Sequence, residues 1–414
     1  LAGLPEPGVP IPVKPSILCA EDLAPADTAG LDPHRVVGLA TTLGGPTSHT
    51  AIIARQLGIP CVVAVGGLDD VPVGTMVLLD GNRGTITLDP DRADAAAAVA
   101  AADVAAASMA GWSGPGATSD GHPVLILANV ADGAAARAAR QAPVEGVGLF
   151  RTELCFLERD SEPSVDEQAS IYGEVLEAFA GHKVVIRTLD AGSDKPLKFV
   201  TTPAEANPAL GVRGFRIVAH NAELVARQLD AIAVAAERTG NAPWVMAPMI
   251  ATADEARQFA GLARDRGLHP GVMIEVPAAA LLAGRLLEHV EFLSIGTNDL
   301  AQYTMAADRM SSDLATLTDP WQPGVLALVA ATARAGAAVG KPVGVCGEAA
   351  ADPMMACVLT GFGVTSLSAA ASAVTPVGAK LATVTLQQCR DAADAVLATA
   401  TPAQAREAAM AVLG

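Results

Sequence analysis

The sequence predicts an α/β protein whose larger part is a (β/α)8 TIM barrel. From about residue 122, short apolar runs alternate with polar turns and helix-length stretches, and eight such runs suit a barrel. They cover residues 124–128, 146–150, 184–188, 244–248, 271–275, 292–296, 343–347 and 364–368. A doubly wound parallel sheet is the alternative. The barrel is favoured because residues capable of chemistry fall at the C-terminal ends of the runs, where barrels carry their active sites.

Composition narrows the class of protein. The 414 residues are 51% hydrophobic but only 3% aromatic, so the core must consist mostly of Ala, Val, Leu and Ile. A net charge of −17 argues against a nucleic-acid partner, which would require clustered Lys and Arg. No apolar run approaches the roughly 18 residues of a membrane span. The 6 cysteines include no Cys-x-x-Cys pair, and no signal peptide is recognisable. We therefore expect a cytoplasmic protein without membrane insertion.

The N-terminal part has a different texture. Residues 1–90 contain five β-like runs, at 15–20, 35–40, 60–65, 75–80 and 84–89, and one predicted helix at 50–57. Thr47 and Ser48 are the candidate N-cap of that helix. Residues 91–110 are almost all Ala and precede a Gly-rich stretch, which is typical of a helix-then-loop connector. We thus expect a small domain at 1–90, a linker at 91–120 and the barrel at 121–414.

Charged and polar residues follow the predicted strands in a regular manner. Each could be a surface ion pair if taken alone. Together they describe a pocket for a small polyanion and a divalent metal, because guanidinium groups match phosphate and carboxylate bidentately. The set comprises Arg151, Arg187, Arg213, Glu275, Asn298, Asp299, Arg309 and Cys346.

Three members of the predicted site have competing interpretations. Glu275 and Asp299 could hold Mg²⁺ with substrate phosphate oxygens, or they could belong to a structural hydrogen-bond network. Cys346 lies between glycines in VGVCGE, and on the residues alone a small buried core thiol is the favoured interpretation.

His49 has a setting that no other histidine shares. It lies in GGPTSHTAIIARQLG, at the start of the predicted helix and behind a Gly pair. A phosphate there would meet free N–H groups and the positive end of the helix dipole. The same dipole favours neutral imidazole, the form that can attack phosphorus. A surface capping histidine is the alternative.

The motifs also resemble a known family. Residues 44–62 resemble the phosphohistidine swivelling domain, a β/β/α domain. Six further motifs, at 146–156, 184–196, 207–216, 271–280, 292–309 and 344–353, resemble the phosphoenolpyruvate-binding TIM barrel. Their order and wording are similar to those of the enzyme I family of the bacterial phosphotransferase system, the phosphoenolpyruvate-protein phosphotransferases. The resemblance covers nearly the whole chain.

The resemblance implies a role for each residue. His49 would accept the phosphoryl group of phosphoenolpyruvate, with release of pyruvate, and pass it to a histidine-containing phosphocarrier protein. Glu275 and Asp299 would hold Mg²⁺, and Cys346 would donate a proton to the enolpyruvate carbon, which replaces its interpretation as a core thiol. Substrate phosphate and carboxylate would be bound by Arg151, Arg187, Arg213, Asn298 and Arg309. The family also implies a homodimer formed through the barrel.

Some features depart from the family. Ala24 stands where a Thr or Ser is usual, and DAGSDKP replaces the usual Gly-Gly before Asp-Lys. The helical subdomain that receives the phosphocarrier is expected upstream of this region and is not in the sequence. Two alternatives stay open. A dikinase or phosphoenolpyruvate synthase would need a nucleotide-binding domain, and a non-catalytic regulatory or dimerisation module would not need the intact site residues.

Overall fold

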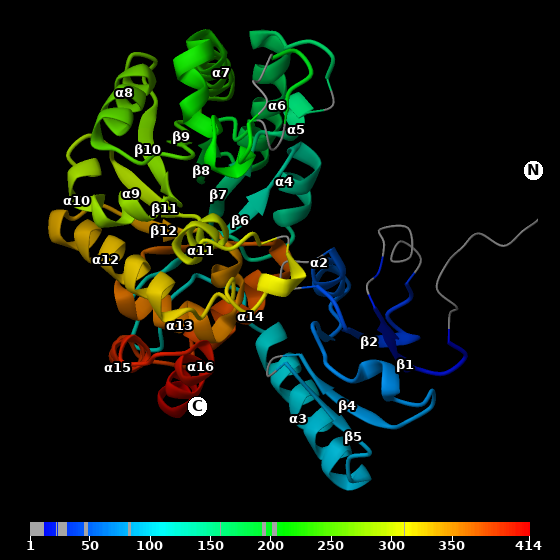
Figure 1. Cartoon of the computed structure of the whole chain (residues 1–414). Helices are drawn as coiled ribbons and strands as arrows, with labels where there is room; N and C mark the ends of the chain where they lie inside the picture. Colours follow the sequence, from blue (N-terminus) through cyan, green and yellow to red (C-terminus); the bar gives the residue numbers. More distant parts are fainter. Residues whose placement is uncertain are drawn as a thin grey trace, which may run out of the picture. The chain divides into compact units, whose positions relative to one another are not determined.

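The computed structural model describes residues 12–21, 23, 31–44, 49–81, 84–157, 159–192, 196–200, 205–309 and 311–414. The chain forms two compact units (Figure 1). The first contains residues up to Ser108 together with Met305–Asp319, and the second contains Met109–Thr304 and Pro320–Gly414. Residues 305–319, assigned to the barrel from the sequence, are thus grouped with the first unit. The domain boundaries expected near residues 90 and 120 stay predictions.

The first unit contains two small sheets. Strands β1 (Ser16–Ala20), β2 (Val36–Thr41) and β3 (Cys61–Val62) form a parallel sheet in that order, and β4 (Val77–Asp80) pairs antiparallel with β5 (Thr85–Leu88). Helix α2 (His49–Leu57) leads from β2 to β3. Its Ala54 is buried against Leu23, Val36 and Leu39, which make the core of this unit. The β-like runs and the single helix expected from the sequence are therefore present.

Helix α3 (Arg92–Ala110) is the alanine-rich segment. Nearly all of residues 92–104 are exposed, so burial does not explain the helix. Asp91 Oδ1 accepts hydrogen bonds from the backbone N–H groups of Ala93 at 2.8 Å and Asp94 at 3.1 Å, which caps the N-terminus. Alanine propensity and this cap together account for the expected connector helix.

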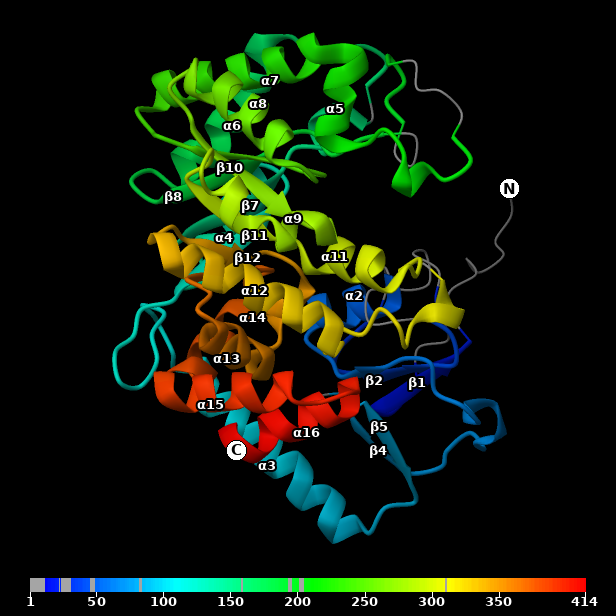
Figure 2. The ribbon, with the colours of Figure 1, turned by 60° about the vertical axis from the view of Figure 1, so that its left-hand side comes forward.

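The second unit is built on a closed parallel barrel of eight strands, which confirms the predicted fold class (Figures 1 and 2). Each of the eight apolar runs overlaps one strand. The strands are β6 (Leu125–Val130), β7 (Gly146–Arg151), β8 (Lys183–Arg187), β9 (Trp244–Ala247), β10 (His269–Ile274), β11 (Phe292–Ile295), β12 (Val343–Val345) and β13 (Ser366–Ala369). Pairing of β13 with β6 and of β9 with β10 closes the barrel. A doubly wound sheet is excluded.

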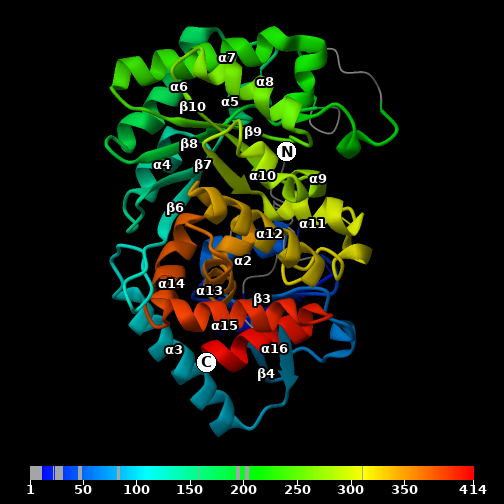
Figure 3. The same ribbon diagram turned by 90° about the vertical axis from the view of Figure 1, so that its left-hand side faces the viewer.

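Helices surround the strands, as expected for alternating β/α units (Figure 3). They are α4 (Gly133–Ala139), α5 (Leu154–Leu157), α6 (Val165–Ala178), α7 (Val218–Thr239), α8 (Ala253–Arg264), α9 (Pro277–Leu281), α10 (Ala283–Leu286), α11 (Thr297–Met305), α12 (Pro323–Val339), α13 (Pro353–Phe362), α14 (Ala371–Leu381), α15 (Leu386–Leu397) and α16 (Pro402–Leu413). The last two pack on α13. Among the described helices, none combines the length and apolarity that crossing a membrane requires.

Alternating residues of each strand fill the barrel. The buried interior cluster contains Leu149, Val185, Met246, Met273, Phe292 and Cys346, with Trp244 packed against it. A Cβ on Gly271 would overlap the ring of Phe292 on the neighbouring strand, so only glycine lets this ring lie against β10. Because side chains alternate along a strand, Lys183, Val185 and Arg187 share one face of β8. Arg187 thus lies at the C-terminal end of the barrel and Lys183 at its N-terminal end.

Candidate active site

The predicted site residues of the second unit come from the C-terminal ends of several barrel strands. Arg151 and Arg187 end β7 and β8, and Glu275 directly follows β10. Asp299 lies in the first turn of α11, after β11, and Cys346 follows β12. Since all eight strands are parallel, these ends belong to one mouth of the barrel.

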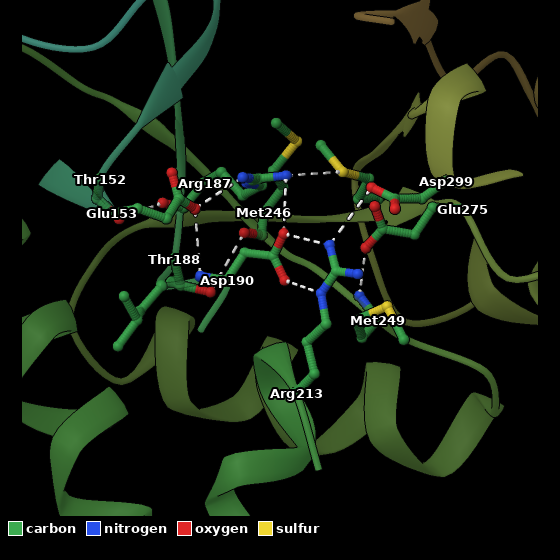
Figure 4. Close-up of polar contacts among 12 residues, drawn as sticks. Thr152, Glu153, Arg187, Thr188, Asp190, Arg213, Met246, Met249, Glu275 and Asp299 are labelled. Carbon is green, nitrogen blue, oxygen red and sulfur yellow. Dashed lines mark hydrogen bonds and ion pairs between the residues drawn. The ribbon is translucent and has the colours of Figure 1, made fainter. Parts of the chain in front are cut away.

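Arg213 is held by two carboxylates at this mouth (Figure 4). Its Nε and Nη2 donate to the two oxygens of Asp190, each at 2.9 Å. Nη2 also lies 3.4 Å from Asp299 Oδ2, and Nη1 donates to the Tyr303 hydroxyl at 3.3 Å. Arg213 is almost fully buried, and although burial opposes its charge, the hydrogen bonds and charges of Asp190 raise its pKa overall. The guanidinium is therefore permanently charged and fixed in orientation.

Arg187 is the second buried guanidinium (Figure 4). Its Nη2 donates to Glu153 Oε1 at 2.7 Å, and Nη1 lies 3.4 Å from Asp190 Oδ2. The backbone carbonyl of Arg187 accepts a hydrogen bond from Thr152 Oγ1 at 3.0 Å. Gln228 in turn donates to Thr152 Oγ1 at 3.0 Å. A buried polar network behind the strand therefore positions this arginine.

Glu275 and Asp299 lie next to each other, on the side of the Arg213 guanidinium opposite to Asp190 (Figure 4). Glu275 is fully buried, and its Oε1 accepts the backbone N–H of Met249 at 2.6 Å. Met249 has a φ of +61°, a left-handed conformation that is strained for methionine and turns its N–H to the carboxylate. Burial, and then the charges of Asp190 and Asp299, raise the pKa of Glu275 to about 8.

Unpartnered buried polar atoms gather at this mouth. Among the described residues, five such atoms occur, and three of them are Arg187 Nε, Glu275 Oε2 and Asp299 Oδ1. The other two belong to Thr297 and Thr304, on the helix α11 that carries Asp299. Buried polar groups without partners are costly in a native protein unless a ligand satisfies them. One unpartnered donor and two unpartnered carboxylate oxygens fit an anion together with a cation.

Glu275 and Asp299 offer carboxylate oxygens of the kind that Mg²⁺ takes from proteins. In the part of the chain that the structure describes, no three His, Cys, Asp or Glu side chains form a preformed metal site. Mg²⁺ commonly takes one or two protein carboxylates and completes its octahedron with water and substrate phosphate oxygens. The unpartnered oxygens of Glu275 and Asp299 match that ligand set.

Cys346 lies at the base of the mouth, within the barrel core. Its thiol donates to the carbonyl of Ile295 at 3.5 Å, and Asn129 Nδ2 donates to the Cys346 carbonyl at 3.2 Å. Burial is the main cause that raises the pKa of this thiol, which therefore stays protonated at neutral pH. Cys346 is thus both a packed core residue and a proton-carrying group beside the site.

Two predicted ligands of the second unit are less constrained. The side chain of Arg151 is exposed and makes no hydrogen bond or ion pair within the described ranges, although its charge acts on the Cys346 thiol. Asn298 is half-buried, and its Oδ1 accepts the backbone N–H of Glu348 at 3.0 Å. This bond orients the side-chain amide of Asn298 and leaves its nitrogen for another partner.

The remaining predicted residues fall in the first unit. His49 is the first residue of α2, but its side chain lies outside the described part of the structure, as do Ala24 and the predicted N-cap residues Thr47 and Ser48. Arg309 belongs to the segment Met305–Asp319. The parts played by His49 and Arg309 at the barrel mouth therefore stay predictions.

The sequence interpretation missed two of the carboxylates that hold the arginines. Glu153 follows Arg151 by two positions, and Asp190 follows Arg187 by three. This short spacing could have predicted both carboxylates, because an acidic residue two or three positions after a strand-end arginine lies at the same end of the barrel. The spacing does not predict which arginine each carboxylate binds.

Known proteins similar to this chain give a consistent result. A family model described as the PEP-utilising enzyme, PEP-binding domain, matches residues 112–386, and the mobile domain of the same enzymes matches residues 11–84. A phosphoenolpyruvate-protein phosphotransferase of Streptomyces coelicolor is 52% identical over 398 residues, which cover 95% of this chain and 72% of the relative.

Two further relatives agree. A phosphoenolpyruvate-protein phosphotransferase of Haloferax volcanii is 42% identical over 92% of this chain and 69% of its own length. A multiphosphoryl transfer protein of Rhodobacter capsulatus is 45% identical over 92% of this chain, which corresponds to 48% of that longer protein. Together with the barrel and the residues at its mouth, these matches establish that the chain belongs to the phosphoenolpyruvate-protein phosphotransferase family.

Proposed function

We propose that this chain transfers the phosphoryl group of phosphoenolpyruvate to His49, releases pyruvate, and passes the phosphoryl group on to a histidine-containing phosphocarrier protein. The observation that carries the proposal is the set of unpartnered buried atoms, Arg187 Nε, Glu275 Oε2 and Asp299 Oδ1, at one mouth of the barrel. A substrate phosphate and Mg²⁺ would satisfy all three atoms.

The charges at the mouth favour joint binding of metal and substrate. The mouth contains two buried guanidinium groups and four carboxylates. If all four carboxylates are ionised, negative charge is in excess and would repel a phosphate that binds without a metal. The four carboxylates are Glu153, Asp190, Glu275 and Asp299. Mg²⁺ bound by Glu275 and Asp299 would neutralise this excess and stabilise charge on the substrate oxygens.

The arginines serve as binding groups in this proposal. Arg213 offers Nη1, whose contact with Tyr303 is long, and Arg187 offers its unpartnered Nε. Arg151 is exposed at the end of β7 and can turn toward the substrate carboxylate, while Asn298 offers its amide nitrogen. Arg309 is the fourth arginine of the predicted set. Fixed guanidinium groups stabilise the equatorial phosphate oxygens during in-line transfer.

The chemical step balances with two groups of this chain. Neutral His49 attacks phosphorus, the bond between phosphorus and the enol oxygen breaks, and its electron pair stays on the enolate. The methylene carbon of the enolate takes the proton of the Cys346 thiol, which gives pyruvate, and the thiolate recovers a proton from water. A thiol whose pKa is raised by burial carries the proton that this step needs.

The proposal extends to the state of the protein in the cell. We expect a cytoplasmic homodimer formed through the barrel, because the family resemblance implies this assembly. All six cysteines are described and are free thiols, which agrees with a reducing compartment.

Intact-mass spectrometry tests the reaction. With phosphoenolpyruvate and Mg²⁺, the chain should gain one phosphoryl group and form one equivalent of pyruvate, and a chelator should abolish both. Pyruvate formation without phosphorylation of the chain would indicate a phosphatase instead, and an unchanged mass without pyruvate would support the non-catalytic alternative.

A further inference from the structure

A small pocket lies at the N-terminal end of the barrel strands, opposite the mouth that carries Arg187 and Glu275. Its lining includes Lys183, Phe292 and Ser366, which are the first residues of β8, β11 and β13. Further inside, the hydroxyl-bearing Ser294 and Ser368 complete a wall that is partly polar and partly apolar. The proposed phosphoryl transfer uses none of these groups.

Lys183 lines this pocket with its amine beside two aromatic rings. Its Nζ lies 3.8 Å from the ring centroid of Trp244 and 5.6 Å from that of Phe292. Within the described residues it makes no hydrogen bond and no ion pair. Cation–π contacts replace only part of the water that an ammonium group loses on burial. Burial accordingly lowers the pKa of Lys183 to about 8.

The other described lysines differ from Lys183. Lys198 forms an ion pair with an aspartate at 2.8 Å. Lys341 and Lys380 donate to backbone carbonyls near the ends of α10 and α16. Lys14 is exposed to water. Among the lysines that the structure describes, Lys183 alone is sheltered from water and has no oxygen acceptor for its amine.

We propose that Lys183 is an acylation site whose side-chain amine reacts with small acyl phosphates. The amine lone pair attacks the acyl carbon, the bond between that carbon and the bridging oxygen breaks, and inorganic phosphate leaves with the bonding electrons. The proton of the amine passes to water. The pocket is small, so a short acyl phosphate should reach the amine more readily than a bulky thioester carrier.

The product is an amide without charge. It removes the cost of burying an ammonium group without an oxygen partner. Acylation at this position should therefore leave the barrel folded.

The test compares lysines within one chain. The folded protein is incubated with acetyl phosphate at neutral pH, and acetylation of each lysine is followed by peptide mass spectrometry. A pKa near 8 raises the neutral fraction of the amine by about two orders of magnitude over ordinary lysine, and lower nucleophilicity and access offset part of this gain. We expect Lys183 to react at least about tenfold faster than Lys14.

The same reaction in concentrated urea is the control, because unfolding makes the lysines equivalent. Loss of the preference in urea would support the proposal. Equal or slower acetylation of Lys183 in the folded chain would overturn it, and so would a preference that survives unfolding. The variant Lys183→Arg should lose the labelled peptide and keep the acetylation rates of the other lysines, which confirms the assignment of the signal.

Discussion

The Asp190 carboxylate joins the two buried arginines of the barrel mouth. Its oxygens accept from Arg213 Nε and Nη2 at 2.9 Å each, and Oδ2 also lies 3.4 Å from Arg187 Nη1. Asp190 is almost fully buried, so solvent screens these interactions little. One carboxylate thus sets the orientation of both guanidinium groups before a substrate arrives. Asp190 is a positioning residue in this account.

Replacing Asp190 with Asn should weaken substrate binding without removing a substrate contact. The amide keeps the shape but loses the charge and one acceptor, so Arg213 and Arg187 lose their common anchor. We expect phosphoenolpyruvate affinity to fall by about tenfold or more, and stability to fall by roughly 3–5 kcal/mol because a buried ion pair is broken. Calorimetry and thermal melts measure both. Asp160→Asn, which removes an exposed partner of Lys198, is the matched control and should change neither.

Metal and substrate should bind with positive coupling. If Glu275 and Asp299 share one Mg²⁺ that also contacts substrate phosphate, saturating Mg²⁺ should raise phosphoenolpyruvate affinity by about tenfold or more. Glu275→Gln and Asp299→Asn should each abolish the coupling. The control is Glu288→Gln, at an exposed ion pair with Arg285. Equal phosphoenolpyruvate affinities with and without Mg²⁺ in the unmodified chain would contradict a shared site.

The raised pKa of Glu275 makes stability depend on pH. The folded chain holds the Glu275 proton up to a pKa of about 8, whereas an unfolded glutamate loses it near 4.5. The contribution of Glu275 to the free energy of unfolding is therefore fully present below pH 4.5, and it is lost as pH rises through 8. Without metal, Glu275→Gln should lose less stability between pH 5 and about pH 9 than the unmodified chain. If stability falls equally with pH in the two variants, Glu275 ionises like an ordinary glutamate and the prediction is wrong.

The sequence predicted the barrel because its signal is repeated. Eight apolar runs, most of them followed by a helix-length stretch, indicate eight parallel strands even if the exact strand ends are uncertain by a residue or two, and all eight strands are present. In the first unit the run at 60–65 yields only the two residues of β3. Strand length there depends on pairing with β2, which spacing alone does not fix.

The site was only partly predictable. Parallel strands bring their ends together, so the approach of Arg187, Glu275 and Asp299 follows from the fold class. The ion pairs of Glu153 and Asp190 depend on the directions of side chains from neighbouring strands, and the hydrophobic periodicity of the sequence does not predict these directions. Cys346 was ambiguous for a physical reason, since the barrel mouth and the barrel core meet at its position.

Substitution of Cys346 distinguishes a catalytic role of its thiol from a role in core packing alone. If its thiol protonates the enolate, Cys346→Ala should lower pyruvate formation by about 10²–10⁴-fold and leave phosphoenolpyruvate affinity nearly unchanged. The control Cys357→Ala removes a thiol that is fully buried in α13, so it should lower the melting temperature and spare turnover per folded molecule. Equal turnover in the two variants would remove Cys346 from the mechanism.

The central claim is that His49 carries the phosphoryl group, and locating that group on the chain tests it most directly. After incubation with phosphoenolpyruvate and Mg²⁺, peptide mass spectrometry under neutral conditions should find one phosphohistidine at His49. His49→Ala should abolish phosphorylation while the barrel still binds phosphoenolpyruvate with normal affinity, and His34→Ala, at an exposed histidine of the same unit, should change neither. Phosphorylation that persists on another residue of the His49→Ala chain would contradict the account.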